Sequence, residues 1–135
     1  MPNLAKELLK PINPTAIILL GILTSCWGLW LLSPFWNVFE RADLYLTLAV
    51  VSNEDAAGLS ALLVGGLMIY GVIKKRYYSL MIGSQVGFYF WLLISILYFM
   101  GDWRNTGGIV SLGTAVYCGY IAVNLRANKK IGKVQ

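Results

Sequence analysis

The pattern of apolar and charged positions divides the chain into four long apolar segments separated by short polar ones. Each segment runs for at least 18 residues without Asp, Glu, Lys or Arg, at 15–32, 56–73, 79–100 and 107–125. A membrane core about 30 Å thick requires about 20 apolar residues of helix, and about 17 are tolerated. We therefore predict an all-α integral membrane protein, a single domain over 1–135 with four transmembrane helices at about 15–33, 56–73, 79–100 and 107–125.

Polar residues at the segment ends indicate where these helices begin and how they connect. Asn13 and Pro14 are typical of a helix N-cap and first helical position. The stretch 52–55, Ser-Asn-Glu-Asp, offers a capping side chain and two acidic residues that favour a helix N-terminus. The connections 74–78 and 101–106 are short, so we expect the second, third and fourth helices to run antiparallel.

The longest connection, between the first and second spans, is itself partly apolar. A helix over 44–52 would be only about 13 Å long, less than half the membrane core, so it is too short for a fifth span. We predict an amphipathic interfacial helix over about 35–52, although the alternation in 44–48 also fits a short strand. Leu44, Leu48 and Val51 are more apolar than such a helix requires, and they are a candidate surface for a partner protein.

The basic residues lie mostly on one side of this topology, and they account for the net charge of +5. Cytoplasmic loops of membrane proteins carry an excess of Lys and Arg. We therefore expect both termini in the cytoplasm of a bacterium, in its inner membrane, with the lipid bilayer rather than nucleic acid as the partner of these charges. Nine of the eleven Lys and Arg residues fall on this predicted cytoplasmic side: Lys6, Lys10, Lys74, Lys75, Arg76, Arg126, Lys129, Lys130 and Lys133.

Small residues recur at helical spacing within every predicted span. Such residues allow helix backbones to approach closely in lipid. The pattern fits two hypotheses, packing within one four-helix bundle or an interface between copies of the chain, for which the GxxxG of the third span is the first candidate. The candidate packing or oligomer residues are Gly83, Gly87, Gly107, Ser111, Ala115 and Gly119, with Gly21, Ser25, Gly28, Ala57, Ala61 and Gly65 forming similar stripes.

The spans contain none of the charged side chains on which membrane-embedded chemistry usually depends. The chain has no His, and its two cysteines, Cys26 and Cys118, lie far apart in different spans. Acid–base catalysis and proton-coupled transport require titratable groups at the site. We therefore predict no catalytic site, no enzymatic activity, no metal and no cofactor. For the embedded polar residues we expect hydrogen bonds between helices, or, for Ser84 and Gln85, a pore lining in an assembly of several copies.

The second half of the chain, about 57–126, resembles small four-span membrane proteins encoded by tailed phages, some of which are labelled holin-like. The similarity lies in its order: the Gly-rich GLSALLVGGLMIYGVI, the basic KKR, an aromatic span around Phe90 and Trp91, and NTGGIVSLGTAVYCGYIAVNLR. The resemblance implies a phage-associated protein that acts by self-association and can permeabilise the membrane of an infected host; it assigns no residue. The alternatives are an accessory or scaffold subunit that binds a membrane protein partner, and an uncoupled channel or carrier.

Overall fold

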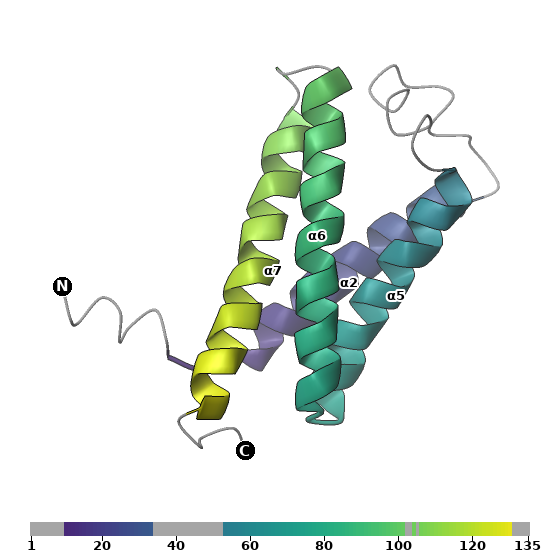
Figure 1. Cartoon of the computed structure of the whole chain (residues 1–135). Helices are drawn as coiled ribbons and strands as arrows, with labels where there is room; N and C mark the ends of the chain where they lie inside the picture. The colour runs from purple at the N-terminus through teal and green to yellow at the C-terminus, as the bar shows by residue number, and fades with distance from the viewer. Residues whose placement is uncertain (1–9, 34–52, 102–103, 105, 131–135) are drawn as a thin grey trace.

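The computed structural model describes residues 10–33, 53–101, 104 and 106–130, and this part of the chain forms a bundle of α-helices (Figure 1). The helices are α2 (Pro14–Leu31), α5 (Glu54–Ile73), α6 (Tyr77–Gly101) and α7 (Thr106–Lys130). All four are long and apolar enough to cross a membrane, which confirms the prediction of four helices of spanning length. The predicted interfacial segment, at about 35–52, lies outside the described residues.

The first two helices begin at the asparagines that the sequence indicates. The side chain of Asn13 accepts a hydrogen bond from the backbone N–H of Thr15 at 3.0 Å, and Pro14 is the first helical residue. At the start of α5, the side chain of Asn53 accepts from the N–H of Ala56 at 2.7 Å. Each cap satisfies a backbone donor that the helix itself leaves without a partner.

The turn between α5 and α6 ends the first of these helices in an unusual way. The N–H of Arg76 donates to the carbonyl of Gly71, and the N–H of Lys75 donates to that of Val72. These two bonds form a Schellman motif, whose central position is left-handed and usually occupied by glycine. Here the position is Lys75, with φ at 52°. The tight turn sets α6 antiparallel to α5.

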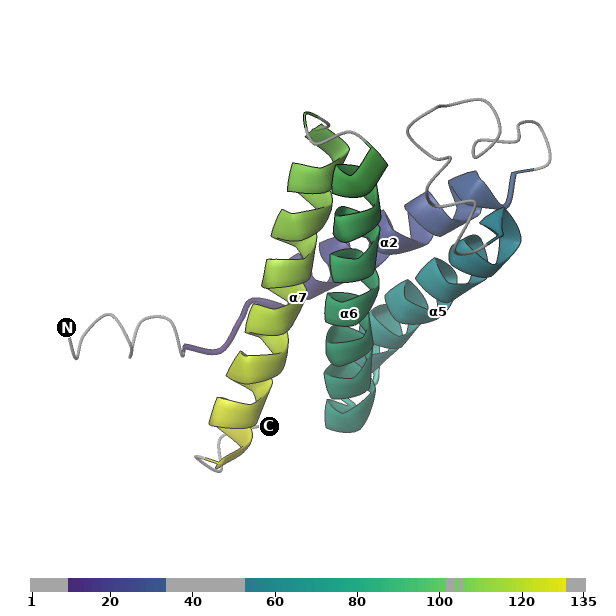
Figure 2. The same ribbon diagram turned by 45° about the horizontal axis from the view of Figure 1, so that its top comes forward.

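The four helices associate as two pairs that cross obliquely. Figures 1 and 2 show α2 lying along α5 and α6 lying along α7, with the first pair inclined behind the second. The pairs meet through α5 and α6, which converge at their shared turn (Figure 1). The helix termini that adjoin basic residues therefore lie together at one end of the bundle, hereafter the basic end. They are the N-termini of α2 and α6 and the C-termini of α5 and α7.

The backbones of α2 and α5 approach each other closely, because glycines face each other across this pair. A Cβ added at Gly28 would lie 2.7 Å from the carbonyl oxygen of Gly58, and one at Gly65 would lie 2.5 Å from that of Gly21. Both separations are shorter than a carbon–oxygen contact allows, and the opposing atom is backbone. The small-residue stripes of these two spans thus contact each other.

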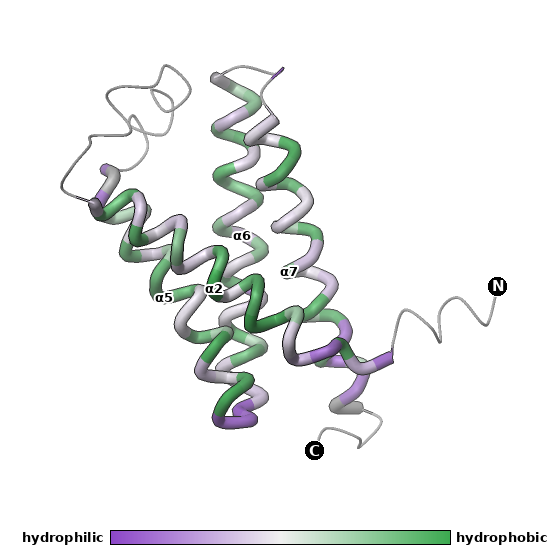
Figure 3. The backbone as a smooth tube through the Cα atoms, turned by 180° about the vertical axis from the view of Figure 1, so that it is seen from behind, coloured by the Kyte–Doolittle hydropathy of each residue, from purple (hydrophilic) through white to green (hydrophobic). Residues whose placement is uncertain are grey.

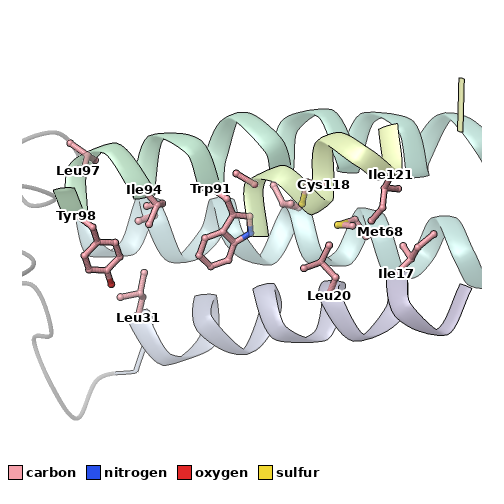
Figure 4. Close-up of a cluster of buried hydrophobic side chains, with 13 residues drawn as sticks. Ile17, Leu20, Leu31, Met68, Trp91, Ile94, Leu97, Tyr98, Cys118 and Ile121 are labelled. Carbon is pink, nitrogen blue, oxygen red and sulfur yellow. The ribbon is translucent and has the colours of Figure 1, made fainter. Parts of the chain in front are cut away.

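The core lies where the two pairs cross and draws side chains from all four helices (Figure 4). Met68 of α5, Trp91 of α6, and Cys118 and Ile121 of α7 point into it, opposite Leu20 of α2. The outward faces of the helices carry equally apolar side chains, such as the exposed leucines and isoleucines expected to contact lipid.

Candidate functional site

Several polar side chains inside the bundle hold one helix to another segment. The indole N–H of Trp91 on α6 donates to the hydroxyl of Thr24 on α2 at 3.3 Å, and that hydroxyl donates to the carbonyl of Leu20 in its own helix. Ser95 of α6 donates to the carbonyl of Gly108 on α7 at 2.9 Å. These contacts agree with the hydrogen-bonding role expected for embedded polar residues.

Two further polar contacts lie at the basic end. The amide of Asn124 on α7 donates to the backbone carbonyl of Lys10 at 2.7 Å, which ties the segment before α2 to the last helix. Ser79 donates to the carbonyl of Leu67 at 2.9 Å, which joins α6 to α5 just above their turn. The basic end of the bundle is therefore cross-linked by hydrogen bonds to backbone carbonyls.

The GxxxG glycines of α6 face the interior of the chain. A Cβ added at Gly83 would meet Met68 of α5 at 3.0 Å, and one at Gly87 would meet Val64 of α5 and Cys118 of α7, both at 3.2 Å. Both glycines are buried. They therefore lie in helix contacts within one chain.

The small-residue stripe of α7 runs along its contact with α6. Ser111 and Ala115 are buried, while Gly107 and Gly119 are partly buried. A Cβ at Gly119 would lie 3.0 Å from the aromatic ring of Phe88 on α6. Gly108, which the spacing did not single out, is covered in the same way by the ring of Phe99. No signal in the sequence pairs these rings with these glycines.

A groove of about 320 Å³ opens on the outer surface between α6 and α7. Its α6 wall consists of Gln85, Phe88 and Tyr89, and its α7 wall runs from Gly119 to Arg126. Because Gly119 has no side chain, the ring of Phe88 packs directly on the α7 backbone at one side of the groove. The surface formed by Gln85, Tyr89 and Val123 is hereafter called the α6–α7 groove.

Three polar side chains, those of Gln85, Tyr89 and Arg126, line this groove, and Gln85 is the amide among them. Its amide is partly exposed, and it makes no hydrogen bond within the part of the chain that the structure describes. One turn further along α6, Tyr89 is 68% exposed and borders a second groove of about 450 Å³ shared with α5. α6 thus presents an amide and a phenol outward in the middle of an apolar helix.

The other residues singled out from the sequence do not form a site among the described residues. Leu44, Leu48 and Val51 lie outside the described residues. Cys26 is exposed and Cys118 is buried, and both are free thiols. Among the residues that the structure describes, no three His, Cys, Asp or Glu side chains gather in a way that could hold a metal ion.

The described part of the chain is a helical bundle with an apolar exterior, and Gln85 places an amide on that exterior. Its one buried side-chain oxygen without a hydrogen bond, among the described residues, is Ser84 Oγ on α6. Comparison of the sequence and the structure with protein-family models, curated proteins and solved structures found no match.

Proposed function

We propose that this chain is a bacterial inner-membrane protein that acts by self-association, with the α6–α7 groove as the contact between copies. The observation that carries the proposal is Gln85, an amide with two donors and one acceptor that no described residue satisfies. In hydrocarbon there is no water to replace the missing partners. A second copy supplies them symmetrically, because each Gln85 amide donates to the carbonyl oxygen of the other.

The depth of Gln85 supports a partner within the membrane rather than at its surface. It lies eight residues after Tyr77, the first residue of α6, or about 12 Å along the helix axis. A helix of 25 residues spans about 37 Å, so this position falls inside a core about 30 Å thick. Glutamine side chains at such depths stabilise helix association by about 0.6–1.7 kcal/mol each.

We also propose an orientation of the chain in the membrane and a result of its self-association. The basic residues gathered at one end of the bundle favour both termini in the cytoplasm, with the segment at about 35–52 on the opposite face of the membrane. The proposed outcome of self-association is holin-like permeabilisation, in keeping with the phage-associated proteins that the second half resembles. An accessory role toward another membrane protein is the competing outcome.

Disulfide cross-linking in membranes tests the contact directly. In a Cys26→Ser background, Val123→Cys places a thiol in the α6–α7 groove, where the native side chain is 60% exposed. Leu19→Cys on α2 is the matched control, since Leu19 is 61% exposed and also lies near the basic end. We expect dimers from Val123→Cys and few from Leu19→Cys.

Gln85→Leu added to the Val123→Cys chain should reduce the cross-linked fraction about threefold, as expected for the loss of about 0.6 kcal/mol. Induced expression of the native sequence should depolarise the bacterial membrane, and Gln85→Leu should delay that loss. Equal cross-linking at both positions would show random collision and contradict the proposed contact. Cross-linking without depolarisation would retain self-association and exclude permeabilisation, while cross-linking to one foreign protein would favour the accessory role.

A further inference from the structure

A separate pocket of about 350 Å³ lies at the basic end of the bundle, where all four helices meet. This volume is within the range of about 300–1,000 Å³ that small-molecule sites occupy. Its walls are apolar apart from Lys75 and the phenol of Tyr77. The apolar lining consists of Ile12, Pro14, Ile17, Gly71, Val72, Leu80 and Leu125. The pocket is therefore shaped for a molecule with an apolar body and one anionic end.

The charge around the mouth of the pocket has a single sign among the described side chains. Lys74 and Arg76 flank Lys75 in the turn, and Arg126 and Lys10 lie on the neighbouring segments at the same end. Figure 3 shows most of the hydrophilic backbone, coloured purple, at this end of the bundle. Basic pockets between membrane helices are the usual binding places of anionic lipid head groups.

The backbone at Lys75 gives the pocket its cation. The left-handed position of a Schellman motif is occupied by glycine in most helices, because a side chain there costs about 1–2 kcal/mol. Lys75 occupies it with φ at 52°, and its side chain lines the pocket while Lys74, one residue earlier, does not. The turn thus directs one of its three basic residues toward the apolar cavity.

We propose that this pocket binds one anionic glycerophospholipid from the surrounding leaflet. The lipid phosphate is held by Lys75, and an acyl chain lies against the apolar wall that Ile17, Leu80 and Leu125 form. The occupant is a lipid rather than free phosphate, because most of the lining is apolar and offers free phosphate no favourable contact. This site does not depend on self-association of the chain.

Native mass spectrometry of the purified protein tests this proposal, with dioleoylphosphatidylglycerol and dioleoylphosphatidylcholine added in turn. We expect the native chain to retain one phosphatidylglycerol, with a preference of about fivefold over phosphatidylcholine, which corresponds to about 1 kcal/mol for one basic residue at the head group. Lys75→Gln should remove the preference. Lys74→Gln removes the same charge outside the pocket and should retain it.

Two other outcomes would overturn the proposal. Equal losses in Lys75→Gln and Lys74→Gln would show that the turn attracts anionic lipid through its total charge and not through the pocket. Glycerol 3-phosphate, which has a phosphate group of at least the same negative charge but no acyl chain, should not compete with phosphatidylglycerol. If it does compete, the apolar wall contributes nothing and the site is one for free phosphate esters.

Discussion

The two helix pairs of this protein use glycine in different ways. Between α2 and α5, glycines face backbone carbonyls: the Cβ positions of Gly28 and Gly65 would lie 2.7 and 2.5 Å from carbonyl oxygens of the opposite helix. Between α6 and α7, glycines face aromatic rings: the corresponding distances from Gly108 and Gly119 are 2.9 and 3.0 Å, to atoms of phenylalanine side chains.

This difference separates a rigid contact from an adjustable one. A backbone carbonyl moves only if its whole helix moves, whereas a phenylalanine ring can change its torsion angle at a small cost. One added methyl group at the α2–α5 contact should therefore displace one helix relative to the other. At the α6–α7 contact it should displace only a phenylalanine ring. The groove beside Phe88, which we propose as the contact with a second copy of the chain, lies on the adjustable side.

The largest expected effect is at the α2–α5 contact. Gly65→Ala should destabilise the protein by about 3 kcal/mol, because the new methyl group overlaps the carbonyl of Gly21 and forces the pair apart. Its neighbour Gly66 has nothing within 4 Å of an added Cβ, so Gly66→Ala should be neutral or stabilise by up to about 1 kcal/mol. The measurement is the free energy of unfolding in detergent micelles, and equal values for the two variants would refute the rigid contact.

A smaller effect is expected at the α6–α7 contact. Gly119→Ala should change the free energy of unfolding by about 1 kcal/mol or less, because the ring of Phe88 can turn away from the added methyl group and alanine favours the helix. Gly113→Ala on the same helix, with nothing within 4 Å, is the control. A loss at Gly119 as large as that at Gly65 would mean that both pairs are equally rigid.

The smallest expected effect concerns the hydrogen bond between α6 and α7. Ser95→Ala removes the bond to the carbonyl of Gly108 and should cost about 0.6 kcal/mol, the average for such bonds in membrane bundles. Thr114→Ala removes a hydroxyl that bonds only within its own helix, to Val110, and should cost less. If Ser95→Ala proves as damaging as Gly65→Ala, polar bonds rather than close packing hold α7 in place.

The number and position of the helices could be predicted from the sequence because their cause is local. A charge-free window long enough to span the membrane, preceded by a capping residue or followed by basic residues, determines a helix regardless of its neighbours. Asn13 and Asn53 cap their helices for the same reason. The extension of α7 to Lys130 was not predicted, since charged residues beyond the apolar window continue the helix at no cost in water.

The face that each helix turns inward could not be predicted, because in a membrane protein the interior and the lipid are both apolar. The GxxxG sequence of Gly83 and Gly87 would be the same whether these glycines packed on Met68 of their own chain or on a second copy. Gln85 was recognisable as polar, but its outward position depends on how α5 and α7 orient α6. The same holds for Tyr89, for the ring of Phe88 over Gly119, and for the pocket beside Lys75.

The bond between Thr24 and Trp91 has a consequence for biogenesis. The two residues are 67 positions apart, so α2 enters the membrane during synthesis well before its partner has left the ribosome. Because the Thr24 hydroxyl donates to Leu20 within α2, its only hydrogen is already satisfied while the helix waits in lipid. The lone pairs that remain accept the indole N–H when α6 arrives. Thr24 therefore leaves no hydroxyl donor unsatisfied in α2 before α6 arrives, and it still offers an acceptor for Trp91.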